Sequence, residues 1–595
     1  MPALYAVCMA LIMLGYVRYA QYAPNGDSIS YMDISSSSLH GRWHEAVNAY
    51  WGPGYPALLA VSRFFTHLDR AREMHAYYWA NYCIFIFSIL CLTCMVRAFL
   101  QIRSMNEHRI GLGLNWAISN RSVYVLVYSI AWISFQNEYS VNHIMVDAFF
   151  AGLLMLAIAL LTHALRTISI GPHAALGCVL GLLYLVKSPG LILGIWMITI
   201  LLWIEYLHSK SLRRTCINVG ISGITFLLIS LFYIMSISKQ MGHFTLGDSS
   251  RLNYAWQIDD TAMGHLLQNQ PNRFGNSSVK LTHQEHELLS NPVVVLFQEF
   301  PHATYAPWLN PSYYDAGIYP HYSLVRLLVA YARNARKSLR LLLEYLLPAI
   351  FIFSLFYQKA FLQTSGISRN LALGLFSLAI LNLLLYLPFN FLPRYTAAAL
   401  WILFSALIAF TELPSGDVER ARNWLGGAIF IFSFAVMVMG MQQVFSMRQD
   451  DIGQRQNKPG WHDDTQSEIA MHLQNLGIKK HGSIACFQCF NGDIWARLAS
   501  VHITAEIYDT RYMTDASHPG QEWRSLPNKP AILESLHAVG IAGIVGRFNT
   551  QPIQDPALAE TWQQLAGNYY WLSTQTPEAR TPVKQTPATP QPAAR

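Results

Sequence analysis

Residues 3–33, ALYAVCMALIMLGYVRYAQYAPNGDSISYMD, join an apolar run directly to a short polar segment that holds two carboxylates. The apolar run over residues 3–20 approaches the roughly 20 residues that an α-helix needs to cross the hydrocarbon of a bilayer. No basic segment precedes it, and no small-x-small cleavage site precedes Pro24, so we interpret it as a retained membrane span and not as a signal peptide. Asp27 and Asp33 therefore follow immediately after a membrane-spanning helix.

The composition of the whole chain extends this prediction. Of the 595 residues, 53% are hydrophobic and 13% are charged, whereas an ordinary soluble domain is about 25% charged. The motif LVKSPG around Pro189 leaves open whether one kinked helix or two short helices occupy that region. We predict a multi-pass α-helical membrane protein with about 11 transmembrane helices. The apolar windows lie near residues 3–20, 76–99, 116–135, 146–165, 173–186, 190–207, 216–236, 341–357, 370–388, 395–411 and 425–446.

The distribution of basic residues in short loops predicts the orientation of these spans. If the N-terminus is cytoplasmic, the short outer loops hold little beyond Lys187 and Arg394. The inner loops then hold Arg103, Arg109, Arg166, Lys210, Arg213, Arg214, Lys359, Arg369, Arg420 and Arg422. This orientation places the long loops 21–75 and 237–340 outside the cytoplasm, together with everything after residue 450.

The sequence changes character after the last apolar window. Residues 1–449 are predicted to form the transmembrane domain, and residues 450–575 alternate helical periodicity with short β-type runs, which is typical of a small α/β domain. Residues 576–595 are rich in Pro and Thr and are predicted to be disordered. The net charge of +7 fits loops that face anionic membrane lipids, so nucleic acid is not an expected partner.

Four charged residues lie at the predicted outer ends of separate spans or loops: Asp27, Asp147, Lys187 and Arg394. Each has an ordinary structural alternative. The two acids are suited to capping helices, and the two bases are suited to reaching the lipid headgroups. Because charges at the edge of hydrocarbon are costly unless they are paired or face a polar cavity, one shared cavity explains all four together.

Such a cavity suits one kind of chemistry. A carboxylate within reach of a hydroxyl accepts its proton as a C–O bond forms, and fixed cations stabilise a departing phosphate. The pattern therefore favours glycosyl transfer from a lipid phosphate.

The same residues carry a resemblance to a known family. The segments NGDSISYMDIS, VDAFFAGLLML, LGLLYLVKSPGLIL, TYAPWLNPSYYDAGI and LPRYTAAAL occur in the order seen in GT-C membrane glycosyltransferases. The chain resembles the branch that contains protein O-mannosyltransferases, lipid A aminoarabinose transferases and many bacterial members. The resemblance covers roughly residues 1–450 and implies a GT-C-like transmembrane domain.

The resemblance also implies roles. Asp27 matches the first acid of the first-loop motif, the general base of the family, and Asp147 matches the second outer acid, which lines the acceptor cavity. Lys187 and Arg394 match basic positions that contact the polyprenyl phosphate. Ser28 stands where the family often has a second acid, which puts a two-acid or metal-binding role of this motif in doubt.

Aromatic residues of the outer loops are candidates for contacts with the sugar or the acceptor: Tyr31, His302, Tyr305 and Trp308. The structural alternative is that they anchor the loops at the membrane interface.

Two smaller motifs are candidates for other chemistry. Cys486 and Cys489 have C-x-x-C spacing, and two ordinary thiols, a structural disulfide or a redox pair are the alternatives. HQEHE over residues 283–287 favours a solvated polar helix over a metal site. We predict no cofactor, and the sequence leaves open, without supporting it, a dependence on a divalent metal.

The resemblance therefore implies an inverting glycosyltransferase that uses a polyprenyl-phosphate sugar. Together with the loop charges, it predicts an enzyme of a bacterial inner membrane with its active site outside the cytoplasm. Its expected partners are a polyprenyl-phosphate sugar donor, a lipid, glycan or protein acceptor, and membrane lipids. The main alternative is a multi-pass transporter or lipid flippase without glycosyl transfer. A non-catalytic scaffold whose outer domain binds a partner, and a membrane ligase or polymerase acting on diphosphate-linked glycans, are further alternatives.

Overall fold

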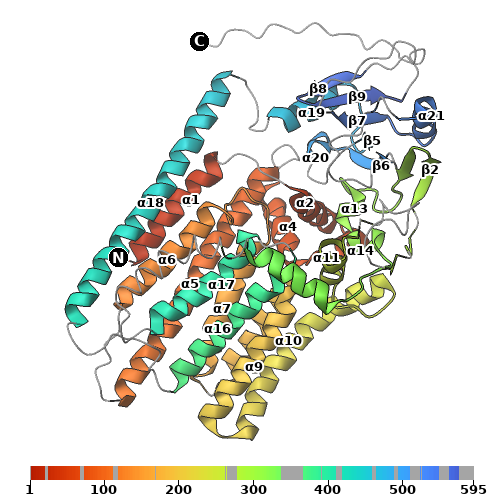
Figure 1. The fold of residues 1–595 in the computed structure, drawn as a ribbon. Coiled ribbons are helices and arrows are strands. Elements are labelled where there is room, and N and C mark those ends of the chain that lie inside the picture. Colours follow the sequence, from red (N-terminus) through yellow and green to blue (C-terminus); the bar gives the residue numbers. More distant parts are fainter. Residues whose placement is uncertain are drawn as a thin grey trace. The chain divides into compact units, whose positions relative to one another are not determined.

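A computed structural model gives the fold of the chain (Figure 1). The described residues are 2–19, 25–67, 73–110, 118–167, 169–261, 263, 278–279, 281–283, 285–336, 339, 366–389, 392–410, 418–457, 464–487, 494–508, 523, 526–548 and 562–574.

The described chain is dominated by long apolar helices, as predicted for a multi-pass membrane protein. Eight helices among the described residues are long and apolar enough to cross a membrane. They are α1 (Pro2–Tyr19), α5 (Glu73–Ile110), α7 (Asp147–Ala164), α9 (Pro189–Ser209), α10 (Leu212–Met241), α16 (Ile367–Tyr386), α17 (Pro393–Phe410) and α18 (Val418–Asn457). Two shorter helices of 17 residues, α6 (Asn120–Gln136) and α8 (Ile170–Val186), occupy two further predicted spans. The predicted span at 341–357 lies outside the described residues.

The LVKSPG region forms two helices and not one kinked helix. Helix α8 ends at Val186, and α9 begins at Pro189 after Ser188 at its N-cap. Because proline lacks an amide hydrogen and fixes its φ angle, it fits the first position of a helix without losing a hydrogen bond. The break leaves Lys187 in extended backbone between the two helices.

Close helix packing in the bundle depends on small residues. A Cβ atom added to Gly181 on α8 would lie 2.6 Å from Cβ of Ile229 on α10, and one added to Gly177 would collide with the backbone of Ser222. Gly177 and Gly181 stand four residues apart, the spacing that lets two membrane helices approach closely. Helix α8 is thereby held firmly at the position from which Lys187 emerges.

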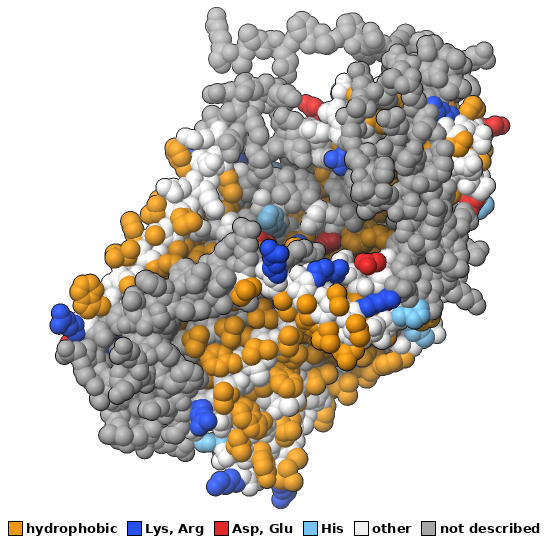
Figure 2. Space-filling view, viewed as in Figure 1, with side chains coloured by type: hydrophobic (Ala, Val, Ile, Leu, Met, Phe, Trp, Pro, Cys, Tyr) orange, Lys and Arg blue, Asp and Glu red, His pale blue; other side chains and the backbone are white. Residues whose placement is uncertain are grey.

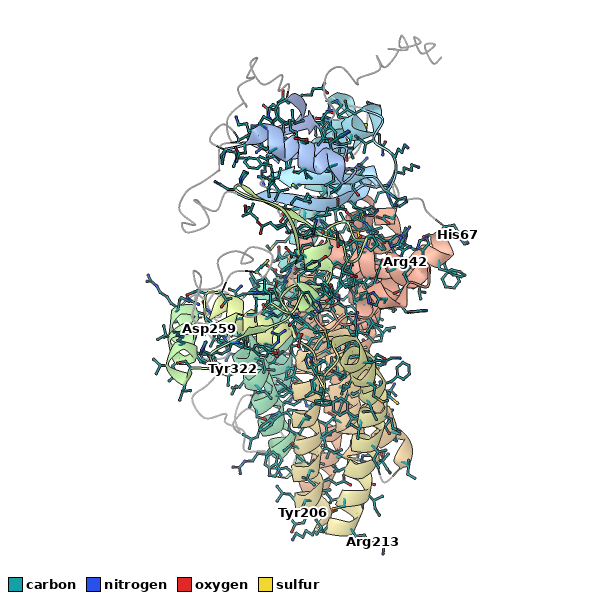
Figure 3. All side chains as sticks on the ribbon, turned by 90° about the vertical axis from the view of Figure 1, so that its right-hand side faces the viewer. Arg42, His67, Tyr206, Arg213, Asp259 and Tyr322 are labelled. Atoms are coloured by element: carbon teal, nitrogen blue, oxygen red, sulfur yellow. The ribbon has the colours of Figure 1, made fainter. Side chains whose placement is uncertain are left out.

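Short elements fill one end of the bundle. They are α2 (Gly26–Leu39), α3 (Trp43–Ala46), α4 (Gly54–Thr66), α11 (Ser249–Gln257), α13 (Ala306–Leu309), α14 (Pro311–Tyr314), a helix over residues 324–336 and the antiparallel pair β1 (Ser278–Val279) and β4 (Ile318–Tyr319). Figure 3 shows Tyr206 and Arg213 at the opposite end of the bundle from Arg42, His67, Asp259 and Tyr322.

The chain divides into two compact units. The first comprises Met1–Gln284 with Pro307–Asp464, and the second comprises Glu285–Ala306 with Thr465–Arg595. The sequence predicts one outer loop over the whole of 237–340, whereas the structure places the 22 residues from Glu285 to Ala306 in the second unit.

The second unit contains a seven-stranded mixed sheet in the order β2-β3-β6-β5-β7-β9-β8. Its strands are β2 (His286–Ser290), β3 (Val293–Leu296), β5 (Ser483–Phe487), β6 (His502–Tyr508), β7 (Gly543–Arg547), β8 (Gln563–Ala566) and β9 (Tyr569–Ser573). The three central strands are parallel, and the outer ones are antiparallel. Two apolar clusters involve alternate residues of the central strands. The helices of this unit are α19 (Asp464–Asn475), α20 (Trp495–Ala499) and α21 (Lys529–Ala538).

Candidate active site

Asp27 lies in the first turn of α2, and a neighbouring residue caps that helix. The side chain of Asn25 accepts a hydrogen bond of 2.9 Å from the Ser28 amide, and Ser28 Oγ accepts one of 3.3 Å from the Asn25 amide. This reciprocal pair is a capping arrangement that satisfies two otherwise unbonded amides. Asn25, and not Asp27, therefore caps this helix. Ser28, which stands where the resembled family often has a second acid, takes part in the same cap.

Asp147 is the first residue of α7 and makes ion pairs with two cations. Its Oδ1 atom lies 2.6 Å from Nζ of Lys187, and its Oδ2 atom lies 3.7 Å from Nε of Arg394. The N-cap of α7 is Val146, which makes no side-chain capping bond. With its side chain 6% exposed, Asp147 is a nearly buried carboxylate held between two positive charges.

Lys187 does not extend toward the lipid headgroups. Its side chain is 18% exposed, and its ammonium lies 5.0 Å from the ring centroid of Tyr386 and 4.1 Å from that of Tyr395. The two rings are stacked, with centroids 4.7 Å apart. A cation near aromatic faces is attracted by the ring electrons, so the tyrosine pair and Asp147 together fix the ammonium.

Arg394 connects the two acids. Its Nη2 atom lies 3.3 Å from Oδ2 of Asp27 and donates a hydrogen bond of 3.1 Å to the hydroxyl of Tyr395. Arg394 is the second residue of α17, so the start of this helix delivers the guanidinium to the cluster. The four charged residues singled out from the sequence therefore meet in one site, although they come from four separate segments.

The two acids have different surroundings. The side chain of Asp27 is 27% exposed, whereas that of Asp147 is 6% exposed. Burial raises the pKa of Asp27, Arg394 opposes this rise, and the nearby charge of Asp147 adds to it. The indole N–H of Trp308 also lowers the pKa of Asp27. It makes no hydrogen bond with any described residue. Asp27 is therefore the more accessible acid and takes up a proton more readily than an ordinary aspartate.

Aromatic side chains line the site beside Asp27. The ring centroid of Trp308 lies 6.1 Å from that of Tyr50 and 6.0 Å from that of Trp256. Tyr31 packs edge-on against Trp51 at 5.2 Å. The backbone carbonyl of Trp308 accepts hydrogen bonds from Ser30 Oγ, at 2.8 Å, and from Trp51 Nε1, at 3.1 Å. The Ser30 bond attaches the Trp308 segment to α2, the helix that carries Asp27, and the Trp51 bond attaches it to the segment between α3 and α4.

The other two aromatic candidates fold into the second unit. Tyr305 forms a bridge with Ile503 and packs edge-on against Phe297, with the ring centroids 5.9 Å apart. His302 is exposed and also belongs to that unit. Among the candidates for sugar or acceptor contact, the structure brings Tyr31 and Trp308 to the charged cluster within the first unit.

Four aromatic residues of the site are not predictable from the sequence: Tyr50, Trp256, Tyr386 and Tyr395. Tyrosine and tryptophan are common where helices leave a membrane, so none of these residues carries a distinctive local signal. For Tyr395, its position next to Arg394 in LPRYTAAAL is the one available hint.

The two smaller motifs have simple outcomes. Cys486 is disulfide-bonded, so the alternative of an ordinary thiol does not hold at that position. Cys489 lies outside the described residues. The segment HQEHE does not form the expected helix, because His286–Ser290 is strand β2 and pairs with β3. His283 stacks on Tyr313, with ring centroids 3.9 Å apart.

Comparisons with known proteins agree with this architecture. No family model and no curated protein sequence matches the chain. Among solved structures, ArnT from Cupriavidus metallidurans bound to undecaprenyl phosphate has a TM-score of 0.54 at 12% identity, covering 98% of this chain and 99% of ArnT. The same enzyme in its apo state has a TM-score of 0.51 at 13% identity, covering 96% of this chain and 97% of ArnT. This chain has the GT-C fold.

The GT-C fold explains the order of the charged residues along this chain. It places the ends of α2, α7, α8 and α17 beside one another at one end of the bundle, where Asp27, Asp147, Lys187 and Arg394 meet. At 12% identity the likeness to ArnT establishes the fold and leaves the sugar and the acceptor unspecified.

Proposed function

We propose that this chain is an inverting glycosyltransferase that moves a sugar from a polyprenyl-phosphate donor to an acceptor hydroxyl. The observation that carries the proposal is the site in which Lys187 and Arg394 lie against Asp147 and Asp27, at 2.6 and 3.3 Å respectively. It occurs in a GT-C fold similar to an ArnT structure solved with undecaprenyl phosphate bound.

Lys187 and Arg394 are the groups that bind the donor phosphate in this proposal. Both are more than four-fifths buried, with exposed fractions of 18% and 15%, so their charges are weakly screened by water. Each contacts a carboxylate oxygen in the site, so its charged nitrogen is directed toward anionic groups there. Guanidinium and ammonium groups form strong charge-assisted hydrogen bonds to phosphate.

Asp147 holds these two cations in place. It contacts both of them and is nearly buried, so it is poorly placed to reach an incoming hydroxyl. We assign it a positioning role: it sets the separation and direction of Lys187 and Arg394 before the donor binds. This role differs from the acceptor-lining role that the family resemblance implies.

Asp27 is the general base. It is the more accessible acid, and its raised pKa suits a group that must accept a proton. The acceptor oxygen forms a bond to the anomeric carbon as its proton passes to Asp27. The bond between that carbon and the phosphate oxygen breaks, and its electron pair stays on the phosphate. One such displacement inverts the anomeric centre.

Charge balance links the two halves of the reaction. Before transfer, Arg394 is shared between Asp27 and Asp147. When Asp27 becomes neutral by accepting the proton, Arg394 loses one anionic partner at the moment when the leaving phosphate gains negative charge. The guanidinium is then available to the phosphate, which stabilises the transition state without moving a distant group.

The aromatic residues beside Asp27 provide a surface for the sugar ring. Trp308 and Tyr50 present ring faces of the kind that pack against the C–H groups of sugars, and Tyr31 supports this wall through Trp51. Because two fixed cations already face the phosphate, the proposed mechanism uses no divalent metal. We further propose that the site lies outside the cytoplasm in a bacterial inner membrane, as the loop charges indicate.

A donor panel tests the proposal. The purified chain in liposomes is supplied with radiolabelled undecaprenyl-phosphate sugars and with extracts that contain lipid, glycan and protein acceptors. We expect at least one donor to lose its label to an acceptor with release of undecaprenyl phosphate. Movement of intact donor between leaflets, with no release from any donor, would overturn the proposal in favour of a flippase.

A further inference from the structure

A helix over residues 324–336 lies across the bundle at the end that holds Asp259 and Tyr322 (Figures 1 and 3). One face attaches it to the first unit. The side-chain amide of Asn334 donates to the carbonyl oxygens of Leu387, at 3.0 Å, and Phe389, at 3.0 Å. Ala330 is buried in an apolar cluster with Tyr254. The helix is therefore fixed in orientation and presents its remaining surface outward.

The outward surface is strongly apolar. Leu324, Val325, Leu328 and Val329 are 70%, 71%, 57% and 60% exposed. Their spacing puts all four on one side of a helix. A contiguous apolar patch of this kind is unusual on a surface that faces water, and it marks contact with a lipid or a protein.

Positive charges border this apolar surface. Arg326 pairs with Asp259 at 3.1 Å, and Arg333 donates to the carbonyl of Gln257 at 3.0 Å. The side chain of Arg336 is exposed and makes no hydrogen bond or ion pair with any described residue. The segment 324–336, LVRLLVAYARNAR, contains three arginines and no acidic residue, so the charge of its surface favours an anionic partner.

The surroundings identify the partner as a bilayer. Figure 2 shows hydrophobic side chains covering the face over α9 and α10, with Lys and Arg side chains gathered where this apolar surface ends. Exposed aromatic residues, Tyr319 and Tyr322, stand just before the helix, as is common at the level of lipid headgroups. A helix with an apolar side, bordering arginines and a crosswise orientation has the features of one that lies in the membrane interface.

We propose that helix 324–336 docks on anionic phospholipids of the bilayer, with Leu324, Val325, Leu328 and Val329 among the acyl chains and Arg333 and Arg336 against the lipid phosphates. This contact is independent of the reaction proposed above. It also has a structural link to the site, because the carbonyls held by Asn334 directly follow Tyr386, whose ring faces Lys187.

Photo-crosslinking tests the apolar contact. A photoreactive amino acid replaces Leu328 in the full chain, which is placed in vesicles of equal phosphatidylglycerol and phosphatidylcholine. The same substitution at Leu228 on α10, which is 64% exposed, provides the reference for a lipid-facing position. We expect lipid adducts at 328 in a yield comparable with that at 228. Adducts to another protein molecule, or a yield of lipid adducts near background, would overturn the proposal.

The same measurement tests the role of the arginines. At position 328 we expect phosphatidylglycerol adducts to exceed phosphatidylcholine adducts by about fivefold, which corresponds to roughly one basic residue acting on anionic lipid. The double variant Arg333→Gln, Arg336→Gln is expected to lose most of this preference, while Arg213→Gln at the opposite end of the bundle keeps it. A preference that persists unchanged in the double variant would refute docking through these arginines.

Discussion

The ammonium of Lys187 lies 2.6 Å from the carboxylate of Asp147, although 40 residues separate them in the sequence. Lys187 emerges between α8 and α9, and Asp147 begins α7. The pair is nearly buried, and removing one partner of such a pair leaves the other charge uncompensated. The same contact that positions Lys187 for a phosphate therefore also stabilises the protein, and experiments must separate these two roles.

Replacing Lys187 by glutamine is expected to weaken binding of undecaprenyl phosphate by about 10- to 100-fold, the range for losing a hydrogen bond to a charged group. Binding is measured on the purified chain by displacement of a labelled lipid phosphate. Arg213→Gln, which removes an exposed cation at the opposite end of the bundle (Figure 3), is the matched control. The double variant Lys187→Gln, Asp147→Asn removes both charges. If its unfolding temperature returns toward that of wild type while lipid-phosphate binding stays weak, the effect of Lys187 on binding is separate from its effect on stability. Unchanged binding in the single variant would remove Lys187 from the phosphate site.

Tyr395 offers a finer test of how Lys187 is held. The Tyr395→Phe variant keeps the ring 4.1 Å from the ammonium but loses the hydroxyl that accepts a bond from Arg394. Tyr395→Leu loses both interactions. We expect leucine to raise KM for the donor about tenfold, within the range of a desolvated cation–π contact, and phenylalanine to raise it less. Equal effects of the two variants would show that the ring does not hold the lysine.

The pH dependence of transfer reports on Asp27. Because the base must be ionised, kcat/KM is expected to fall as pH decreases through the pKa of Asp27, which burial raises above the ordinary value of about 3.9. Arg394 lowers this pKa and Asp147 raises it. In Arg394→Gln the pKa of Asp27 should therefore be higher, so the residual kcat/KM should fall at a higher pH than in wild type. In Asp147→Asn this pKa should be lower, so kcat/KM should fall at a lower pH. Shifts in the same direction in both variants would contradict this assignment.

Glu506 gives a prediction for the second unit. It is a buried residue of β6, and burial raises its pKa to about 8. In the unfolded chain a glutamate has a pKa near 4.3. Between about pH 4.3 and pH 8 the unfolded chain is therefore ionised while the folded protein still holds the proton, so the free energy of unfolding should fall from pH 5 to pH 8. Glu506→Gln should raise the unfolding temperature at pH 8 more than at pH 5. The exposed Glu534→Gln is the control, and an equal response of the two variants would argue against a neutral Glu506.

The charged part of the site could be predicted because charge is informative at the edge of hydrocarbon. Asp27, Asp147, Lys187 and Arg394 each stand at the end of an apolar run or in the polar segment after one, where an unpaired charge is costly. Because of that cost, their order along the chain is enough to predict that the four side chains lie together in one polar site.

The remainder depends on contacts that leave no local signal. Tyr386 and Tyr395 resemble ordinary interfacial tyrosines until the fold brings them to Lys187. Strand β3 pairs with β6 across some 200 residues of sequence, and antiparallel pairing of distant segments is not encoded in short patterns. For the same reason, the pattern of HQEHE favours a helix, although its second half begins an edge strand.

The central claim is that Asp27 accepts the proton of the acceptor hydroxyl. The most direct test compares the single-turnover transfer rate of Asp27→Asn with that of wild type, using the donor found active in the panel. The account predicts a loss of about 10²- to 10⁴-fold with donor binding retained, while Asp260→Asn, an exposed loop change in left-handed backbone that asparagine tolerates, transfers at the wild-type rate. Transfer by Asp27→Asn within a few-fold of wild type would contradict it.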